Sequence, residues 1–155
     1  MSKQIPILEY VKEVIQANRF AVLATECDGQ PYASLLAVTA TNDYLKLIFA
    51  TYRNTRKYAN LIQNGKIAIL FENRGTNKGE IQNITVLTAL GQAEEINCVI
   101  PDMDMKAHLL RHPELEKFLL SAECAVFRMK VNAYQIVKGI DDSNWWNIGE
   151  FDSLS

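Results

Sequence analysis

The feature that most constrains this chain is a series of short β-rich segments separated by turn residues. Three such segments follow one another between residues 20 and 50, with Cys27-Asp28-Gly29-Gln30 and Thr41-Asn42-Asp43 between them. Connections this short join antiparallel strands. Six strands in one open sheet would leave exposed edges, so we expect closure into a barrel. The predicted strands are Phe20–Thr25, Tyr32–Thr39, Tyr44–Ala50, Ile67–Glu72, Ile84–Ile96 and Ala125–Val137, the last interrupted near Asn132.

Helical periodicity appears in three other places. Apolar residues recur every three or four positions near the N-terminus, which predicts an amphipathic helix that covers part of the core. A polar segment with two glycines, Asn73–Glu80, is predicted to be a loop. The fold class is therefore mainly β with flanking helices. The predicted helices span residues 6–17, 54–64 and 102–120, the last divided into two at Pro113.

Length and composition favour a single domain over residues 1–155, with a short disordered C-terminal tail. A chain of 155 residues can bury one core without disulfide support. The net charge of −2 and the lack of a Lys/Arg run argue against nucleic-acid binding. No apolar run reaches 18 residues, so we expect no membrane segment and a cytoplasmic location. Cys27, Cys98 and Cys124 are odd in number and far apart, which predicts reduced thiols.

The segment after the third strand combines a hydroxyl with cations at the start of a helix. Thr55, Arg56 and Lys57 stand where the helix begins, and Arg53 lies just before them. A helix N-terminus offers unpaired amides and the positive end of a dipole, so these residues together predict an anion site that suits a phosphate. Two alternatives remain at this point: the cations form a solvated helix face, and Thr55 is only a helix cap.

Several motifs in fixed order resemble the pyridoxamine 5′-phosphate oxidase-related FMN-binding split barrels. The similarity covers residues 20 to 96 and implies a six-stranded antiparallel split β-barrel. Gly91-Gln92-Ala93-Glu94 is similar to a later strand of that family. The motifs that carry the resemblance are Gly29-Gln30-Pro31-Tyr32-Ala33-Ser34-Leu35-Leu36, Ala50-Thr51, Thr55-Arg56-Lys57 and Asn60-Leu61, followed by the strand Ile67–Glu72.

The resemblance implies a role for each matching residue. A flavin needs a polar clamp at its phosphate and hydrogen-bond donors near its ring. By resemblance, the phosphate is held by Thr55, Arg56 and Lys57, the ribityl chain and isoalloxazine lie along Ala50 and Thr51, and the ring contacts Ser34, Leu35 and Leu36.

The resemblance also implies a symmetric homodimer with the flavin at the subunit interface. Trp145 and Trp146 lie in the C-terminal segment. Trp145 is predicted to pack against the partner's flavin, and the alternative is that the two tryptophans form a structural anchor.

Two departures from the family pattern bear on the activity. The oxidase members carry an Arg where this chain has Ser34 and a Lys near Thr39, and they end in a basic signature that binds substrate phosphate; this chain has neither. These departures count against pyridoxamine 5′-phosphate oxidase activity itself. The expected function is FMN-dependent oxidoreduction of an unidentified small molecule. The alternatives are a non-catalytic carrier of flavin, deazaflavin or haem, and a dimer without cofactor that acts through protein contacts.

His108 and His112 are four residues apart on a predicted helix. This spacing can place two imidazoles on one metal, with Glu116 as a third ligand, but Pro113 interrupts the helix and no His-Glu-x-x-His motif is present. We therefore expect two surface histidines and no metal. Because related split barrels handle haem, an axial-ligand role for either histidine is the alternative.

Overall fold

The computed structural model describes residues 4–73, 84–97 and 102–149. Much of the predicted loop Asn73–Glu80, Cys98 and residues 150–155 therefore lie outside the described residues. The elements are α1 Gln4–Ala17, β1 Phe20–Cys27, β2 Gln30–Ala37, β3 Thr39–Ala40, β4 Lys46–Tyr52, α2 Arg56–Gln63, β5 Lys66–Asn73, β6 Thr85–Glu95, α3 Met103–Arg111, a short 3-10 helix at Pro113–Leu115, α4 Glu116–Leu119, β7 Cys124–Lys138 and β8 Asp142–Asn147.

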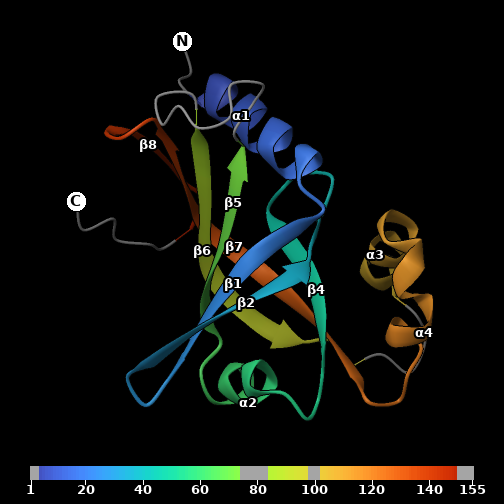
Figure 1. Ribbon diagram of the computed structural model, residues 1–155. Helices are drawn as coiled ribbons and strands as arrows, with labels where there is room; N and C mark the ends of the chain where they lie inside the picture. The colour runs from blue at the N-terminus through green and yellow to red at the C-terminus, as the bar shows by residue number, and fades with distance from the viewer. Residues whose placement is uncertain (1–3, 74–83, 98–101, 150–155) are drawn as a thin grey trace.

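The strands form one antiparallel sheet that curls into a barrel (Figure 1). Its order is β2-β1-β5-β6-β7-β4-β3, and β8 pairs with the far part of β7. The sheet closes because β2 and β3 are separated by Val38 alone, and β3 pairs with β4. The predicted split-barrel fold is confirmed. Its second predicted strand is divided into β2 and β3, and β8 was not predicted.

A β-bulge bends the longest strand where an interruption was predicted. Leu90 pairs with Ala133 and Gly91 pairs with Val131, so Asn132 has no partner on β6. A Cβ atom at Gly91 would clash with the Lys130 carbonyl oxygen, so glycine is needed at this crossing. The strand therefore continues through Asn132, with one extra residue that increases its curvature.

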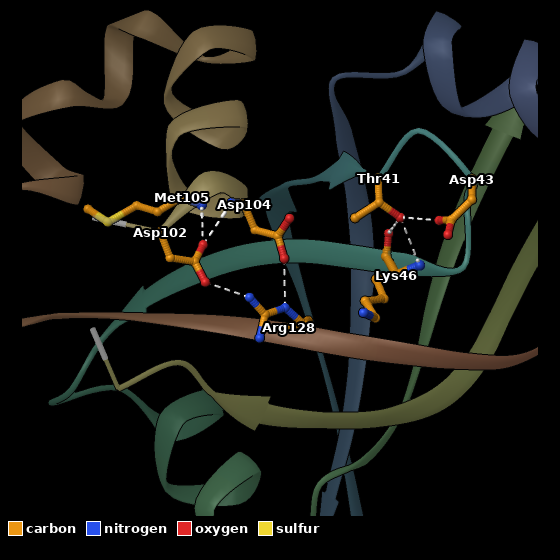
Figure 2. A network of polar contacts seen from close by, with 7 residues as sticks. All are labelled: Thr41, Asp43, Lys46, Asp102, Asp104, Met105 and Arg128. Atoms are coloured by element: carbon orange, nitrogen blue, oxygen red, sulfur yellow. Dashed lines mark hydrogen bonds and ion pairs between the residues drawn. The ribbon is translucent and has the colours of Figure 1, made fainter. Parts of the chain in front are cut away.

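The third strand starts later than predicted, at Lys46, because a turn precedes it. Tyr44 was placed in a strand, but it lies in the turn with a φ of 61°. Its carbonyl oxygen accepts a 2.7 Å hydrogen bond from the Tyr134 hydroxyl, which holds this unusual conformation. The Thr41 hydroxyl donates to Asp43 at 2.7 Å and fixes the other side of the turn (Figure 2).

The main core fills the barrel and extends under α1, which covers one end while α2 lies at the other (Figure 1). The helix contributes Val11, Val14 and Ile15, all at most 2% exposed, to this core. Burial of such side chains supplies about 1.5–3 kcal/mol each. The large barrel residues they join are Leu23, Leu47, Phe49, Ile69, Phe71, Leu87, Phe127, Met129, Tyr134 and Ile136.

The α3–α4 segment packs outside the barrel beside β4 (Figure 1). Leu119 is 3% exposed and lies in a second apolar cluster with Ile48, Ala50 and Val126 from β4 and β7. These strands are therefore covered on both faces, which explains the continuous apolar sequence of β4.

An ion-pair cluster anchors the start of α3 (Figure 2). Arg128 on β7 donates to Asp102 at 2.6 Å and to Asp104 at 2.7 Å. Asp102 is also the N-cap, since its carboxylate accepts from the amides of Asp104 and Met105. Burial alone raises the pKa of Asp102, but these hydrogen bonds outweigh it and leave that pKa below its ordinary value. The cluster fixes α3 in one register against β7.

The two histidines are buried, so the prediction of surface histidines was wrong. His108 is 1% exposed and His112 is 0% exposed. His108 Nδ1 lies 2.7 Å from Thr39 Oγ1, and His112 Nε2 donates to the Val38 carbonyl oxygen at 3.0 Å. Residues four apart on a helix share one face, and here that face meets the barrel where β2 passes into β3.

Burial also changes the protonation of this pair. Loss of hydration, together with the neighbouring charges of His112 and Arg111, lowers the pKa of His108 to about 3. Burial likewise lowers the pKa of His112, although its hydrogen bond to Val38 acts in the opposite direction. Both rings are therefore neutral at pH 7.

The histidine pair predicts acid sensitivity. The unfolded chain binds a proton at His108 near pH 6.5 and the folded chain only near pH 3, so the free energy of unfolding should fall as pH decreases through this window. One such group contributes up to about 1.4 kcal/mol per pH unit. Chemical denaturation of the wild type and of His108→Gln between pH 7 and 4 measures this, and the variant should show the smaller slope. Identical slopes would contradict the prediction.

Candidate functional site

The main candidate site is a cavity of about 350 Å³ between β2 and β4. These strands are brought together by β3 pairing alone, because within the described sheet β2 pairs only with β1. The gap between β2 and β4 is therefore bordered by side chains, without backbone hydrogen bonds across it. The lining residues are Phe20, Leu35, Leu36, Ala37, Ala50, Thr51, Tyr52, Thr55, Lys57, His108, Leu115 and Phe118.

One end of the cavity is polar and lies at the N-terminus of α2. Thr55 is the N-cap, and its hydroxyl accepts from the Tyr58 amide at 3.2 Å and donates to the Tyr52 carbonyl oxygen at 2.8 Å. Among the described contacts, the amides of Arg56 and Lys57 have no acceptor. The Lys57 side chain lines the cavity beside them. This end can therefore bind an anion through amides and charge together.

Arg53 forms a side-chain triad with Glu95 and Tyr58. Its guanidinium donates to Glu95 at 2.6 Å and to the Tyr58 hydroxyl at 3.1 Å, and Tyr58 donates to Glu95 at 2.9 Å. This triad ties the turn before α2 to the end of β6. Arg53 therefore supports the turn before α2, while Arg56 and Lys57 are the first two residues of that helix.

The rest of the cavity lining is mostly apolar. It includes Phe20, Leu35, Leu115 and Phe118, and the Phe118 ring meets Tyr52 edge to face with centroids 4.7 Å apart. His108 also lines the cavity. Phe20, Leu115 and Phe118 were not predicted as site residues, because they come from elements whose position against the gap depends on the tertiary fold.

The structure gathers six of the nine predicted cofactor residues. Leu35, Leu36, Ala50, Thr51, Thr55 and Lys57 line the cavity, and Arg56 stands beside them on the first turn of α2. Ser34 does not line it; its hydroxyl is enclosed and has no hydrogen-bond partner among the residues that the structure describes. Thr51 Oγ1 lies 2.8 Å from Thr55 Oγ1, so the strand end and the helix cap form one polar unit.

Trp145 lies away from the cavity of its own chain. Trp145 on β8 pairs with Gln135 on β7, whereas Ala50 pairs with Val126, nine residues earlier on β7 and about 30 Å away along an extended strand. Trp146 stacks on Tyr134 with centroids 5.6 Å apart. A contact between Trp145 and a partner's cofactor stays a prediction.

Other predicted features can be placed within the described residues. No three His, Cys, Asp or Glu side chains there come together as a metal site, and Cys27 and Cys124 are free thiols. Burial raises the pKa of Cys124 to about 11, so this thiol is protonated at neutral pH. The helices in this part of the chain lack the combination of length and apolar content needed to cross a membrane.

Solved structures with the same fold include proteins that bind different cofactors. A haem-binding protein from Mycobacterium smegmatis has a TM-score of 0.80 and 16% identity over 90% of this chain, which spans only 57% of that protein. A haem storage protein from Vibrio cholerae has a TM-score of 0.67 and 16% identity, covering 90% of this chain and 92% of that one. An FAD-binding protein from Mesorhizobium loti has a TM-score of 0.66 and 20% identity, covering 81% and 88%. At these identities the comparison establishes the fold.

No curated protein matches the sequence. A family model does match the sequence, and the matched range includes the site residues described above. The family described as pyridoxamine 5′-phosphate oxidase matches residues 7–123, which include β1 to β6, α2 and the α3–α4 segment. This range contains every lining residue of the cavity. The chain belongs to the pyridoxamine 5′-phosphate oxidase family.

Proposed function

We propose that this protein binds FMN in the cavity between β2 and β4 and acts as a flavin-dependent oxidoreductase in the cytoplasm. The observation that carries the proposal is the lining of this cavity, which combines an anion-binding helix N-terminus with apolar walls from β2 and β4. FMN has the same division, with a phosphate dianion at one end and a flat ring at the other.

The chemistry of the donor set fits this ligand. The amides of Arg56 and Lys57 have no acceptor among the described contacts, and the cationic side chain of Lys57 lines the cavity beside them, while Arg56 adds a second cation to the same helix turn. Thr55 orients the turn as its cap, and Thr51 supports Thr55. Leu35 and Leu36 on β2 and Ala50 on β4 provide the walls for the ring. When bound, the flavin supplies the redox chemistry, and the chain supplies binding and orientation.

The residues near β3 argue against a phosphorylated substrate. No cation stands at Ser34 or Thr39, and the Thr39 hydroxyl is paired with His108. A substrate phosphate beside the ring would have no charge partner from these positions. Oxidation of pyridoxamine 5′-phosphate itself is therefore not the proposed reaction.

A second copy of this chain is proposed as the partner. On the outer face of the sheet, Leu35, Val22 and Leu70 lie directly opposite one another across β2, β1 and β5. Leu35 is 68% exposed and Leu70 is 39% exposed. Leu35 also lines the cavity, so a copy that covers this apolar face would close the open side of the flavin site.

The second candidate function is a carrier of haem, flavin or deazaflavin without turnover. Two proteins of the same fold are a haem-binding and a haem storage protein, and His108 lies in the cavity as a neutral imidazole, the form that binds iron. Parallel titration separates the candidates, since a Soret band would favour haem and flavin bands that saturate at one per subunit would favour FMN.

Removing the cations of the α2 turn tests the phosphate site. Arg56→Ala with Lys57→Ala should weaken FMN binding at least about tenfold, because hydrogen bonds to charged groups contribute about 1.5–3 kcal/mol. Quenching of flavin fluorescence on titration gives the affinity. Lys66→Ala with Lys130→Ala, two exposed lysines on strands, is the matched control and should bind as the wild type does. Equal affinity in both double variants would contradict the assignment.

A charge on the apolar face tests the dimer. Leu70→Lys should convert a dimer into a monomer, because two copies of the new cation would be buried at the two-fold contact. Sedimentation velocity measures the change. Ile62→Lys on α2, where the side chain is 59% exposed, is the control and should leave the dimer intact. A wild-type monomer, or a Leu70→Lys dimer, would rule out this interface.

A further inference from the structure

We infer that His112 is a positioning residue for the flavin site, because its hydrogen bond to Val38 fixes the junction between the two strands that wall the cavity. His112 is not one of the lining residues, so it can act on FMN only through the shape of the cavity. The inference therefore rests on the proposed function. It adds a residue that determines how well the free protein is prepared to bind FMN.

Val38 joins the two walls of the cavity, since it is the one residue between β2 and β3. The chain before Val38 pairs with β1 and carries the lining residues 35–37. The chain after it pairs with β4, which carries the lining residues Ala50 and Thr51. Within the described sheet no strand pairing links β2 to β4, so the backbone conformation at Val38 sets how far apart the two walls lie.

The polar groups of the Val38 backbone are paired outside the strand ladders. Its amide donates to the Arg19 carbonyl oxygen at 3.2 Å, and its carbonyl oxygen accepts from His112 Nε2 at 3.0 Å. Val38 is 0% exposed, so water cannot replace His112 unless the chain moves. His112 Nδ1 has no hydrogen-bond partner among the described residues, with Glu114 Oε1 3.8 Å away. The ring is therefore oriented by its hydrogen bond to Val38.

The backbone around His112 holds this donor in place. His112 is the C-cap of α3, where its amide donates to the His108 carbonyl oxygen at 3.0 Å, and Pro113 follows it directly. A proline restricts the conformation of the residue before it. At its other end, α3 is held to β7 by the ion pairs of Arg128. The helix thus extends from β7 to the junction at Val38 and presents a fixed donor there.

Loss of the His112 donor would act on FMN binding through the free protein. The buried Val38 carbonyl oxygen would have no partner, and opening of the junction toward water would relieve that cost. Only part of the free protein would then keep the closed cavity. The apparent affinity for a ligand falls by the same factor as the population of its binding-competent form. His112 therefore supports FMN binding by closing the junction beforehand.

Two amide substitutions at His112 test the inference. His112→Gln places an amide nitrogen near the Nε2 position, whereas His112→Asn places it near the Nδ1 position, away from Val38. His112→Asn should bind FMN about tenfold more weakly than the wild type, as expected if about a tenth of the free protein stays closed. His112→Gln should restore the affinity to within about threefold, because it keeps the donor. Quenching of flavin fluorescence measures both.

Leu87→Ala is the control for a general loss of stability. Leu87 is 0% exposed in the core and lies on β6, which pairs with neither β2 nor β4. This substitution should also lower the free energy of unfolding but should leave FMN affinity unchanged. Two results would overturn the inference: FMN affinity that falls in Leu87→Ala as it does in His112→Asn, or His112→Asn that binds FMN as tightly as the wild type.

Hydrogen–deuterium exchange of peptides covering residues 35–40 tests the junction itself. Exchange should be slow in the free wild type, faster in free His112→Asn, and slow again in that variant with FMN. Fast exchange in the free wild type that only FMN slows would overturn the inference, because FMN and not His112 would then close the junction. A wild type that binds no FMN would refute the proposed function instead, and exchange in the free proteins would still decide whether His112 holds Val38.

Discussion

The barrel closes through a strand pair of only two residues, and the rest of the molecule depends on that limited closure. β3 pairs with β4 over Thr39 and Ala40. Backbone groups next to such a short pair need other partners. The α3–α4 segment supplies them, because His112 binds the Val38 carbonyl oxygen and Arg128 holds the start of α3 through two aspartates. The same segment covers the gap between β2 and β4. This gap is the candidate site.

The polar and apolar parts of the cavity lining arise from different levels of structure. The polar part is local: the end of β4, the Thr55 cap and the first turn of α2 are consecutive in sequence. The apolar part is assembled from segments separated by up to about a hundred residues, from Phe20 on β1 to Phe118 on α4.

Local patterns predicted most of the fold. Alternation and turn residues located the barrel strands to within a few residues, because hairpins are specified by neighbouring positions. The strand β8 was not predicted, because its polar residues are typical of a C-terminal tail. It forms a strand through its pairing with β7. Six of nine proposed cofactor residues line the cavity because they belong to one local motif or to the hairpin beside it. The burial of His108 was not predictable, since it depends on where the helix docks on the barrel.

The central claim is that the first turn of α2 receives the phosphate of a flavin. Hydrogen–deuterium exchange of peptides covering residues 50–58, with and without FMN, tests it most directly, because the amides of Arg56 and Lys57 have no acceptor among the described contacts. The account predicts slower exchange in this segment on FMN addition, with little change in β8. Unchanged exchange at residues 50–58 under saturating FMN would contradict it.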